Sequence, residues 1–123
     1  MTSVSIQPWL TVYHVEHAVT FYMAAFDAQE TYRLDSREGS IVQLSVNGAA
    51  FWLSSGSNAD ENISLQANNI RMILIVEDVE DIFNKAIEAG SKMINQLTEN
   101  HGWIVGRIED PFGMHWEIGK QTN

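Results

Sequence analysis

Two side chains near the end of the chain, those of His115 and Glu117, are of types that carry chemistry and are separated by a single residue. Residues i and i+2 of a β-strand point to the same face, so both side chains are expected on one surface. An imidazole beside a carboxylate supplies two metal ligands or a general base. The structural alternative is that each is a polar cleft residue holding a hydrogen bond. Glu117 and His115 are therefore the catalytic candidates.

The other three histidines have structural explanations. His14 and His17 fall at the start of an expected helix, where surface and N-cap roles account for them, and His101 adjoins a turn glycine.

Composition and charge narrow the classes of function that the sequence allows. The chain has no cysteine, so a disulfide framework and a thiolate metal site are excluded. A net charge of −9 opposes binding to nucleic acid and favours a cationic small ligand. No apolar run approaches a membrane span and the first residues lack signal-peptide features, so we expect a cytoplasmic protein with no membrane partner.

The elements that position these residues occur twice. Residues 7–15 align with residues 71–79 at an offset of 64. Late in each half a strand starts at a turn glycine, Gly48 or Gly113, at an offset of 65. A fixed offset of this kind indicates two copies of one small unit. The first helix carries an apolar stripe at helical spacing, formed by Val15, Ala18, Val19, Tyr22 and Met23.

Each copy is predicted to contain a strand, a helix and three strands. Asn47-Gly48 predicts a two-residue hairpin turn, Asp110 to Gly113 a type I turn, and Asp78 and Gly90 the caps of the second helix. The expected strands are 6–13, 31–35, 40–46, 49–54, 70–76, 92–97, 102–109 and 114–119, with helices at about 15–27 and 79–89.

This doubled unit, the segment AVTFY in the first helix and the closing DPFGMHWEIG together resemble the vicinal-oxygen-chelate superfamily. That superfamily contains glyoxalase I, extradiol dioxygenases, fosfomycin-modifying enzymes and bleomycin-resistance proteins. The resemblance implies an α+β fold in which two tandem βαβββ modules form an incomplete barrel with a concave ligand cleft. The single domain, residues 1–123, would comprise a module at about 5–56, a linker at about 57–69 and a module at about 70–120.

Metal-dependent members of the superfamily take ligands from the first and last strands of each module. The matching positions are Gln7 and Arg71 on the first strands, and Trp52 and Glu117 on the last strands. Only Glu117 is a strong ligand, because an amide oxygen binds weakly, an indole has only an N–H donor and a guanidinium is permanently positive. We expect no metal site and no cofactor. Arg71 should occupy the place of the lost ion, close to Glu117, with the two residues contributed by opposite modules.

Strand alternation combined with the family geometry predicts a cleft wall of aromatic faces among a few polar anchors. For Trp9 and Trp52, interface packing is the alternative to ligand contact, whereas Trp116, Phe21, Tyr22 and Phe26 are expected in the core. The predicted ligand-binding residues are Gln7, Trp9, Gln43, Trp52, Arg71, Trp103, Arg107, His115 and Glu117.

These features favour a metal-independent small-molecule-binding protein that resembles the bleomycin-resistance branch, which sequesters a cationic aromatic antibiotic between two chains. Stacking on tryptophan and the acidic charge support this hypothesis. One alternative is a glyoxalase- or dioxygenase-like metalloenzyme with ligands rearranged around Glu117, His115 and either Gln43 or Gln7. The other is a metal-free enzyme in which Glu117 or His115 is the base and Arg71 stabilises an oxyanion.

We predict a homodimer with the cleft near the chain interface, because open curved sheets leave strand edges and apolar faces that need covering. Light scattering at micromolar concentration should give about twice the chain mass of 13.9 kDa. A monomer throughout that concentration range would contradict the prediction.

Overall fold

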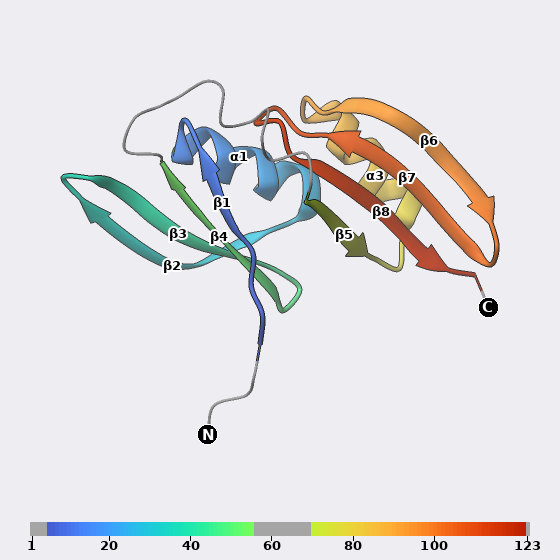
Figure 1. Cartoon of the computed structure of the whole chain (residues 1–123), viewed down its shortest axis with the longest axis horizontal. Coiled ribbons are helices and arrows are strands. Elements are labelled where there is room, and N and C mark those ends of the chain that lie inside the picture. Colours follow the sequence, from blue (N-terminus) through green and yellow to red (C-terminus); the bar gives the residue numbers. More distant parts are fainter. Residues whose placement is uncertain (1–4, 56–69, 123) are drawn as a thin grey trace. The chain divides into compact units, whose positions relative to one another are not determined.

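The structure, a computed structural model, describes residues 5–55 and 70–122. The predicted linker at 57–69 lies outside the described residues. The elements come in the predicted order, strand, helix and three strands, in both halves (Figure 1). The first half contains β1 (Trp9–Val12), α1 (Val15–Phe26), β2 (Gln29–Ser36), β3 (Gly39–Val46) and β4 (Ala49–Ser55). The second contains β5 (Arg71–Ile75), α3 (Val79–Glu88), β6 (Lys92–Asn100), β7 (Trp103–Glu109) and β8 (His115–Gln121).

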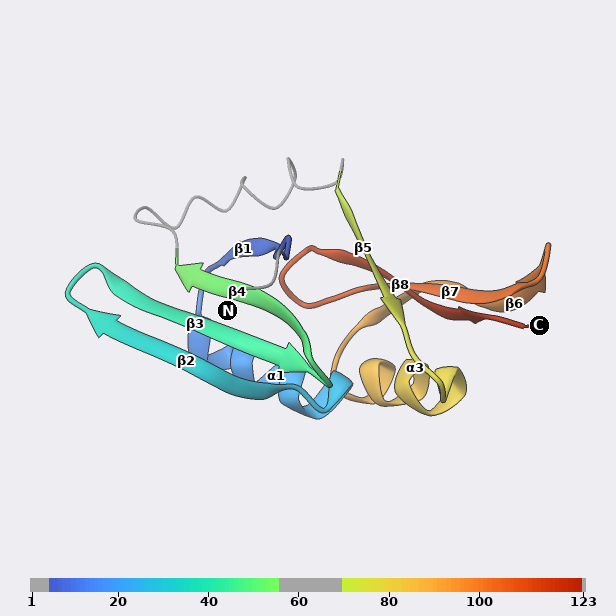
Figure 2. The same ribbon diagram turned by 90° about the horizontal axis from the view of Figure 1, so that it is seen from below.

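Each half forms a four-stranded mixed sheet, with the strand orders β1-β4-β3-β2 and β5-β8-β7-β6. The first and last strands of each module run parallel, and the remaining neighbours are antiparallel. In each module the helix lies against one face of its own sheet (Figure 2). The α+β fold of two βαβββ modules is thus confirmed, and closure of the sheets into an incomplete barrel stays a prediction.

Contacts divide the chain into two compact units, of which the second also takes in Ala24–Phe26 from the last turn of α1. Alternation along β1 buries Leu10 and Val12 and leaves Trp9 exposed, as the sequence predicts. The last strands follow the same pattern, so Trp116 is 4% exposed and lies in the core. No helix of the described residues is long and apolar enough to cross a membrane.

The apolar stripe of α1 is confirmed except at one position. Val15 and Tyr22 are buried, but Met23 is 48% exposed, so its placement in the stripe is wrong. Met23 lies about 80° around the helix from Val15, and the buried surface extends in the other direction, to Phe21 and Ala25. Tyr22 contacts Phe51 of β4 edge to face, with ring centroids 5.2 Å apart, which fixes α1 on the first sheet.

Arg33 of β2 adds a polar connection between α1 and the edge of the first sheet. Its guanidinium forms ion pairs with Glu16 of α1 at 2.6 Å and with Glu30 at 2.9 Å. The hydrogen bond from Arg33 lowers the pKa of Glu30, and a hydrogen bond from Ser40 is the main cause of the lowered pKa of Asp35. These carboxylates are solvent-exposed, so water screens the ion pairs and each contributes little to stability.

Helix α3 begins and packs as its sequence predicts. Asp78 accepts a hydrogen bond from the backbone N–H of Asp81 at 3.3 Å, which confirms the N-cap. The C-cap is Ala89, so the prediction of Gly90 is one residue late, and Gly90 follows with a φ of 120°. A Cβ atom at Gly106 of β7 would lie 2.6 Å from Phe83, so only glycine permits this approach of helix and sheet.

The predicted turns are present. Asn47 and Gly48 both have positive φ angles, of 50° and 99°, as a type I′ hairpin turn requires. In the turn between β7 and β8, the buried Asp110 accepts hydrogen bonds from the backbone N–H groups of Phe112 and Met114, both at 2.9 Å. Its second carboxylate oxygen accepts the indole N–H of Trp116, also at 2.9 Å. One side chain therefore positions the start of β8.

The same turn gives a stability prediction. Gly113 has a φ of 90°, where a β-branched side chain is strained, and its N–H donates to the carbonyl oxygen of Asp110 at 3.1 Å. We expect Gly113→Val to lower the free energy of unfolding by about 1–3 kcal/mol. Urea denaturation measures this quantity directly. Gly113→Asn is the matched control and should cost less, because asparagine tolerates positive φ. A valine variant as stable as the unmodified protein would refute the turn assignment.

Candidate functional site

Gln7 is the centre of a hydrogen-bond network beside the first sheet; it lies two residues before β1, which begins at Trp9 rather than at the predicted residue 6. Its side-chain oxygen accepts from the indole N–H of Trp52 at 2.7 Å and from the amide of Gln43 at 2.9 Å. Gln43 in turn accepts from the hydroxyl of Thr31 at 2.9 Å. Two donors fill the two lone pairs of an amide oxygen. The side-chain oxygen with which Gln7 could bind a cation is therefore already used.

Three aromatic rings lie beside this network and form what we call the aromatic platform: Trp9, Tyr32 and Trp52. The parallel register of β1 and β4 sets Trp9 directly beside Trp52. Their rings stack with centroids 5.8 Å apart and an interplanar angle of 15°, and Tyr32 meets Trp52 edge-on at 5.7 Å. The indole N–H of Trp9 donates to the hydroxyl of Ser54 at 2.8 Å. Both indole N–H groups are thus satisfied within the sheet, while Trp9 remains 52% exposed.

On the second sheet, Glu117 lies between two guanidinium groups, and we call these three residues the charge cluster. One of its carboxylate oxygens is 3.3 Å from Nη2 of Arg107 and 3.4 Å from Nε of Arg71. Arg107 is the antiparallel partner of Glu117 across β7 and β8, and Arg71 comes from the parallel strand β5. The predicted proximity of Arg71 and Glu117 is confirmed. The expectation that they come from opposite modules is wrong, because both strands belong to the second sheet.

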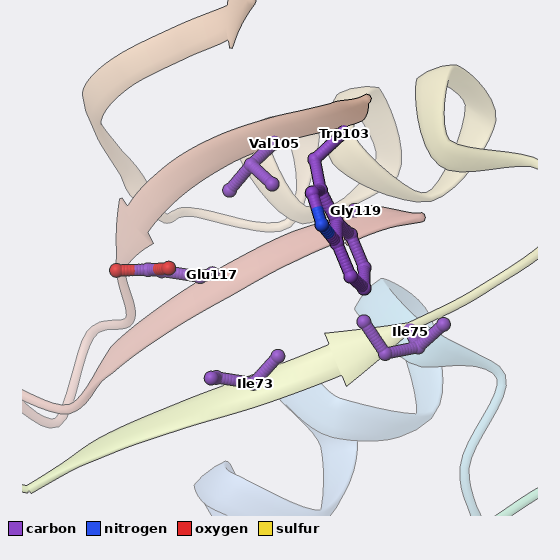
Figure 3. A pocket seen from close by; sticks show the side chains of 6 residues that line it. All are labelled: Ile73, Ile75, Trp103, Val105, Glu117 and Gly119. Atoms are coloured by element: carbon purple, nitrogen blue, oxygen red, sulfur yellow. The ribbon is translucent and has the colours of Figure 1, made fainter. Parts of the chain in front are cut away.

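One member of the charge cluster, Glu117, lines one end of a pocket of about 200 Å³ on the same sheet, and Arg71 and Arg107 lie beside Glu117 outside that lining. Figure 3 shows Glu117 at one end of this pocket, with Trp103 and Ile75 toward the other. Most of the wall is apolar, because alternate residues of β5 and β7 present Ile73, Ile75 and Val105 to it. The lining residues are Ile73, Ile75, Trp103, Val105, Glu117 and Gly119.

The predicted ligand-binding residues thus fall into two groups, one on each sheet. The first group, at the first sheet, consists of Trp9, Gln43 and Trp52 together with Gln7 just before β1, and the second group consists of Arg71, Trp103, Arg107 and Glu117. His115 is half-buried in β8 and lies beside Arg71 in the register of β5 and β8. Its role as base or ligand stays a prediction.

Tyr32 and Ile75 were not predicted at a site. Alternation along the expected strand at 70–76 sends Ile73 to the cleft wall, and Ile75, two residues later, follows from the same alternation. Alternation did not place Tyr32 beside Trp52, because the register of β2 against β3 shifts between Glu30 and Tyr32. A β-bulge of this kind changes which side chains share a face and has no clear signal in the sequence.

The residues at the metal-ligand positions of the superfamily do not fit a divalent metal ion. A hard or borderline cation needs several converging lone pairs, preferably on anionic groups. The oxygen of Gln7 is filled by two donors, Trp52 and Arg71 supply donors only, and Glu117 is paired with two cations. Within residues 5–55 and 70–122, no group of three or more His, Asp or Glu residues could hold a metal ion.

Comparisons with known proteins agree with this fold. The model of the Glyoxalase/Bleomycin resistance protein/Dioxygenase superfamily matches residues 4–118. An uncharacterized protein of Mycobacterium bovis is 30% identical over 125 residues, covering 94% of this chain and 82% of that protein.

Solved structures share the fold at low sequence identity. A glyoxylase/bleomycin resistance protein/dioxygenase domain from Frankia has a TM-score of 0.82 at 15% identity, covering 98% of this chain and 99% of that one. A variant of the fosfomycin resistance protein FosX from Listeria monocytogenes, in complex with Mn(II) and a dihydroxypropylphosphonic acid, has a TM-score of 0.75 at 17% identity, covering 100% and 92%. From the doubled module and the family match, the chain belongs to the glyoxalase/bleomycin resistance protein/dioxygenase superfamily.

Proposed function

We propose that this protein binds a small planar aromatic molecule, without a metal ion, on the aromatic platform of its first sheet. The proposal rests on the hydrogen bond and the ring stacking of Trp52. This residue stands at a metal-ligand position of the superfamily, yet it donates its N–H to Gln7 and stacks against Trp9. Metal-dependent members bind a cation at this position, whereas this protein has an indole ring that stacks on another aromatic ring.

The chemistry of the platform favours ligands that are cationic as well as aromatic. An aromatic pair contributes about 0.5–1.5 kcal/mol beyond the area it buries, and a cation over an indole face contributes about 0.5–2 kcal/mol. The net charge of −9 raises the local concentration of cations around the protein. The hydrogen bonds of Trp9 and Trp52 hold both rings in place before a ligand arrives, which lowers the entropic cost of binding.

Binding of this kind requires no reaction. It agrees with the sequence-based hypothesis of a sequestering protein similar to the bleomycin-resistance branch, whose ligand would be an aromatic antibiotic or another aromatic cation. The metalloenzyme hypothesis is less favoured, because the donor atoms that it needs are engaged within the two sheets. The hypothesis of a metal-free enzyme with Glu117 or His115 as base stays a prediction.

The platform is tested by titrating the protein with proflavine, a planar aromatic cation, and measuring affinity by calorimetry. Trp9→Ala removes a half-exposed ring and should weaken binding about tenfold, equivalent to about 1.4 kcal/mol. Trp52→Phe keeps a ring but loses the hydrogen bond to Gln7, so a smaller loss is expected.

Trp103→Ala is the matched control, because Trp103 is also a partly exposed indole, but on the second sheet. It should bind proflavine as the unmodified protein does. Equal affinities in the Trp9 and Trp103 variants would show that the platform is not the binding surface.

A second prediction concerns metal. Protein purified without a tag should hold no stoichiometric divalent metal in elemental analysis. Zinc, nickel, manganese or iron should not raise its melting temperature. A metal ion bound to a real site, at a free concentration a hundred times its Kd, would add about 2.7 kcal/mol to the free energy of unfolding. Arg71→His removes one cation from the charge cluster and adds an imidazole near Glu117, so this variant should begin to bind metal. A metal ion coordinated by Glu117 in the unmodified protein would contradict the proposal.

A further inference from the structure

We propose that the pocket on the second sheet binds a small aromatic carboxylic acid, with its carboxylate at Arg107 and Arg71 and its ring against the apolar wall. This site goes beyond the proposed function. It uses other residues, lies on the other sheet and takes a ligand of opposite charge to the one expected at the aromatic platform.

The charges of the cluster give the first reason. Two guanidinium groups share one carboxylate, so the cluster carries a net charge of one positive unit from Arg71, Arg107 and Glu117. Both contacts reach the same oxygen, at 3.3 and 3.4 Å. Charge-assisted hydrogen bonds are usually about 2.7–2.9 Å long, so neither arginine is tightly held by Glu117. The cluster therefore retains attraction for one more anion.

The second reason is an N–H group that lacks an acceptor. The Nε atom of Arg107 is buried and has no hydrogen-bond partner among the described residues. An unsatisfied buried donor costs free energy. Since Nε is buried, the guanidinium has to turn toward the pocket before a ligand oxygen can accept its proton and remove that cost. Nε and Nη2 form one edge of the guanidinium fork, and Glu117 contacts only Nη2. A carboxylate is the group whose two oxygens match such an edge.

The wall of the pocket defines the rest of the ligand. Ile73 and Ile75 are 68% and 55% exposed, so their side chains still have apolar surface to bury. Val105 and the indole of Trp103 complete the apolar part. A volume of about 200 Å³ is below the roughly 300–1,000 Å³ of pockets for drug-sized molecules. The ligand is accordingly a single ring with a short acidic side chain.

Three compounds of similar size and different charge test the proposal: phenylacetate, the neutral phenylacetamide and the cationic phenethylamine. Binding at neutral pH is followed by calorimetry and by the NMR signal of the Trp103 indole N–H, which is assigned from Trp103→Phe. We expect phenylacetate to bind about tenfold more tightly than either other compound and to shift the Trp103 signal. The signal of Trp9 should stay where it is.

Variants test which residues bind the carboxylate of the ligand. Arg107→Lys keeps the charge but loses the fork, and should weaken phenylacetate about tenfold. Because Arg107 is largely buried, a second pair of variants avoids a change of fold. At the exposed Ile73, Ile73→Glu adds a negative charge to the pocket and should abolish phenylacetate binding, whereas the neutral Ile73→Gln should weaken it less.

Two results would overturn this proposal: phenethylamine binding as tightly as phenylacetate, or equal phenylacetate affinity in the two Ile73 variants. Trp9→Ala separates the outcome from that of the proposed function. It should leave phenylacetate affinity unchanged, even though it weakens proflavine binding.

Discussion

The parallel pairing of the first and last strands in each module is the constraint on which both candidate surfaces depend. Parallel strands need a long crossover connection, which the helix and the intervening strands supply in each half. The pairing sets Trp9 beside Trp52 in the first sheet and Ile73 beside Glu117 in the second. Residues far apart in the sequence thereby become neighbours, and the aromatic platform and the charge cluster both follow from this register.

Within that register, the polar groups at the superfamily's metal-ligand positions contact partners from their own module. The oxygen of Gln7 accepts two hydrogen bonds, and Glu117 is paired with two guanidinium groups. A free carboxylate and a free amide oxygen would attract a cation, but these are already compensated. The same superfamily frame therefore presents ring faces and arginine side chains where its metal-dependent members present ligands. Ligand recognition, rather than Lewis-acid chemistry, is what this arrangement supports best.

The two modules share a backbone plan but differ in side-chain chemistry. Gln7 and Arg71 are equivalent by the repeat, as are Trp52 and Glu117, and the third strands contribute Gln43 and Arg107 at matching positions. In the first sheet these positions hold neutral groups that orient aromatic rings. In the second they hold charges beside an apolar wall. On this basis we propose that the two surfaces favour ligands of opposite charge.

The sequence by itself determined the order of the elements, the buried faces of β1, β4 and β8, and the hairpin turn at Asn47, because these depend on local periodicity and on backbone angles that few residue types adopt. Together with the resemblance to the superfamily, it also identified Gln7, Trp52, Arg71 and Glu117 as the residues at the metal-ligand positions. Only the tertiary structure decided that Arg107 joins Arg71 at Glu117, that Tyr32 reaches Trp52 after a bulge, and that Asp110 accepts three N–H groups. Such contacts depend on strand register and on the reach of long side chains, and neither is encoded in a local pattern.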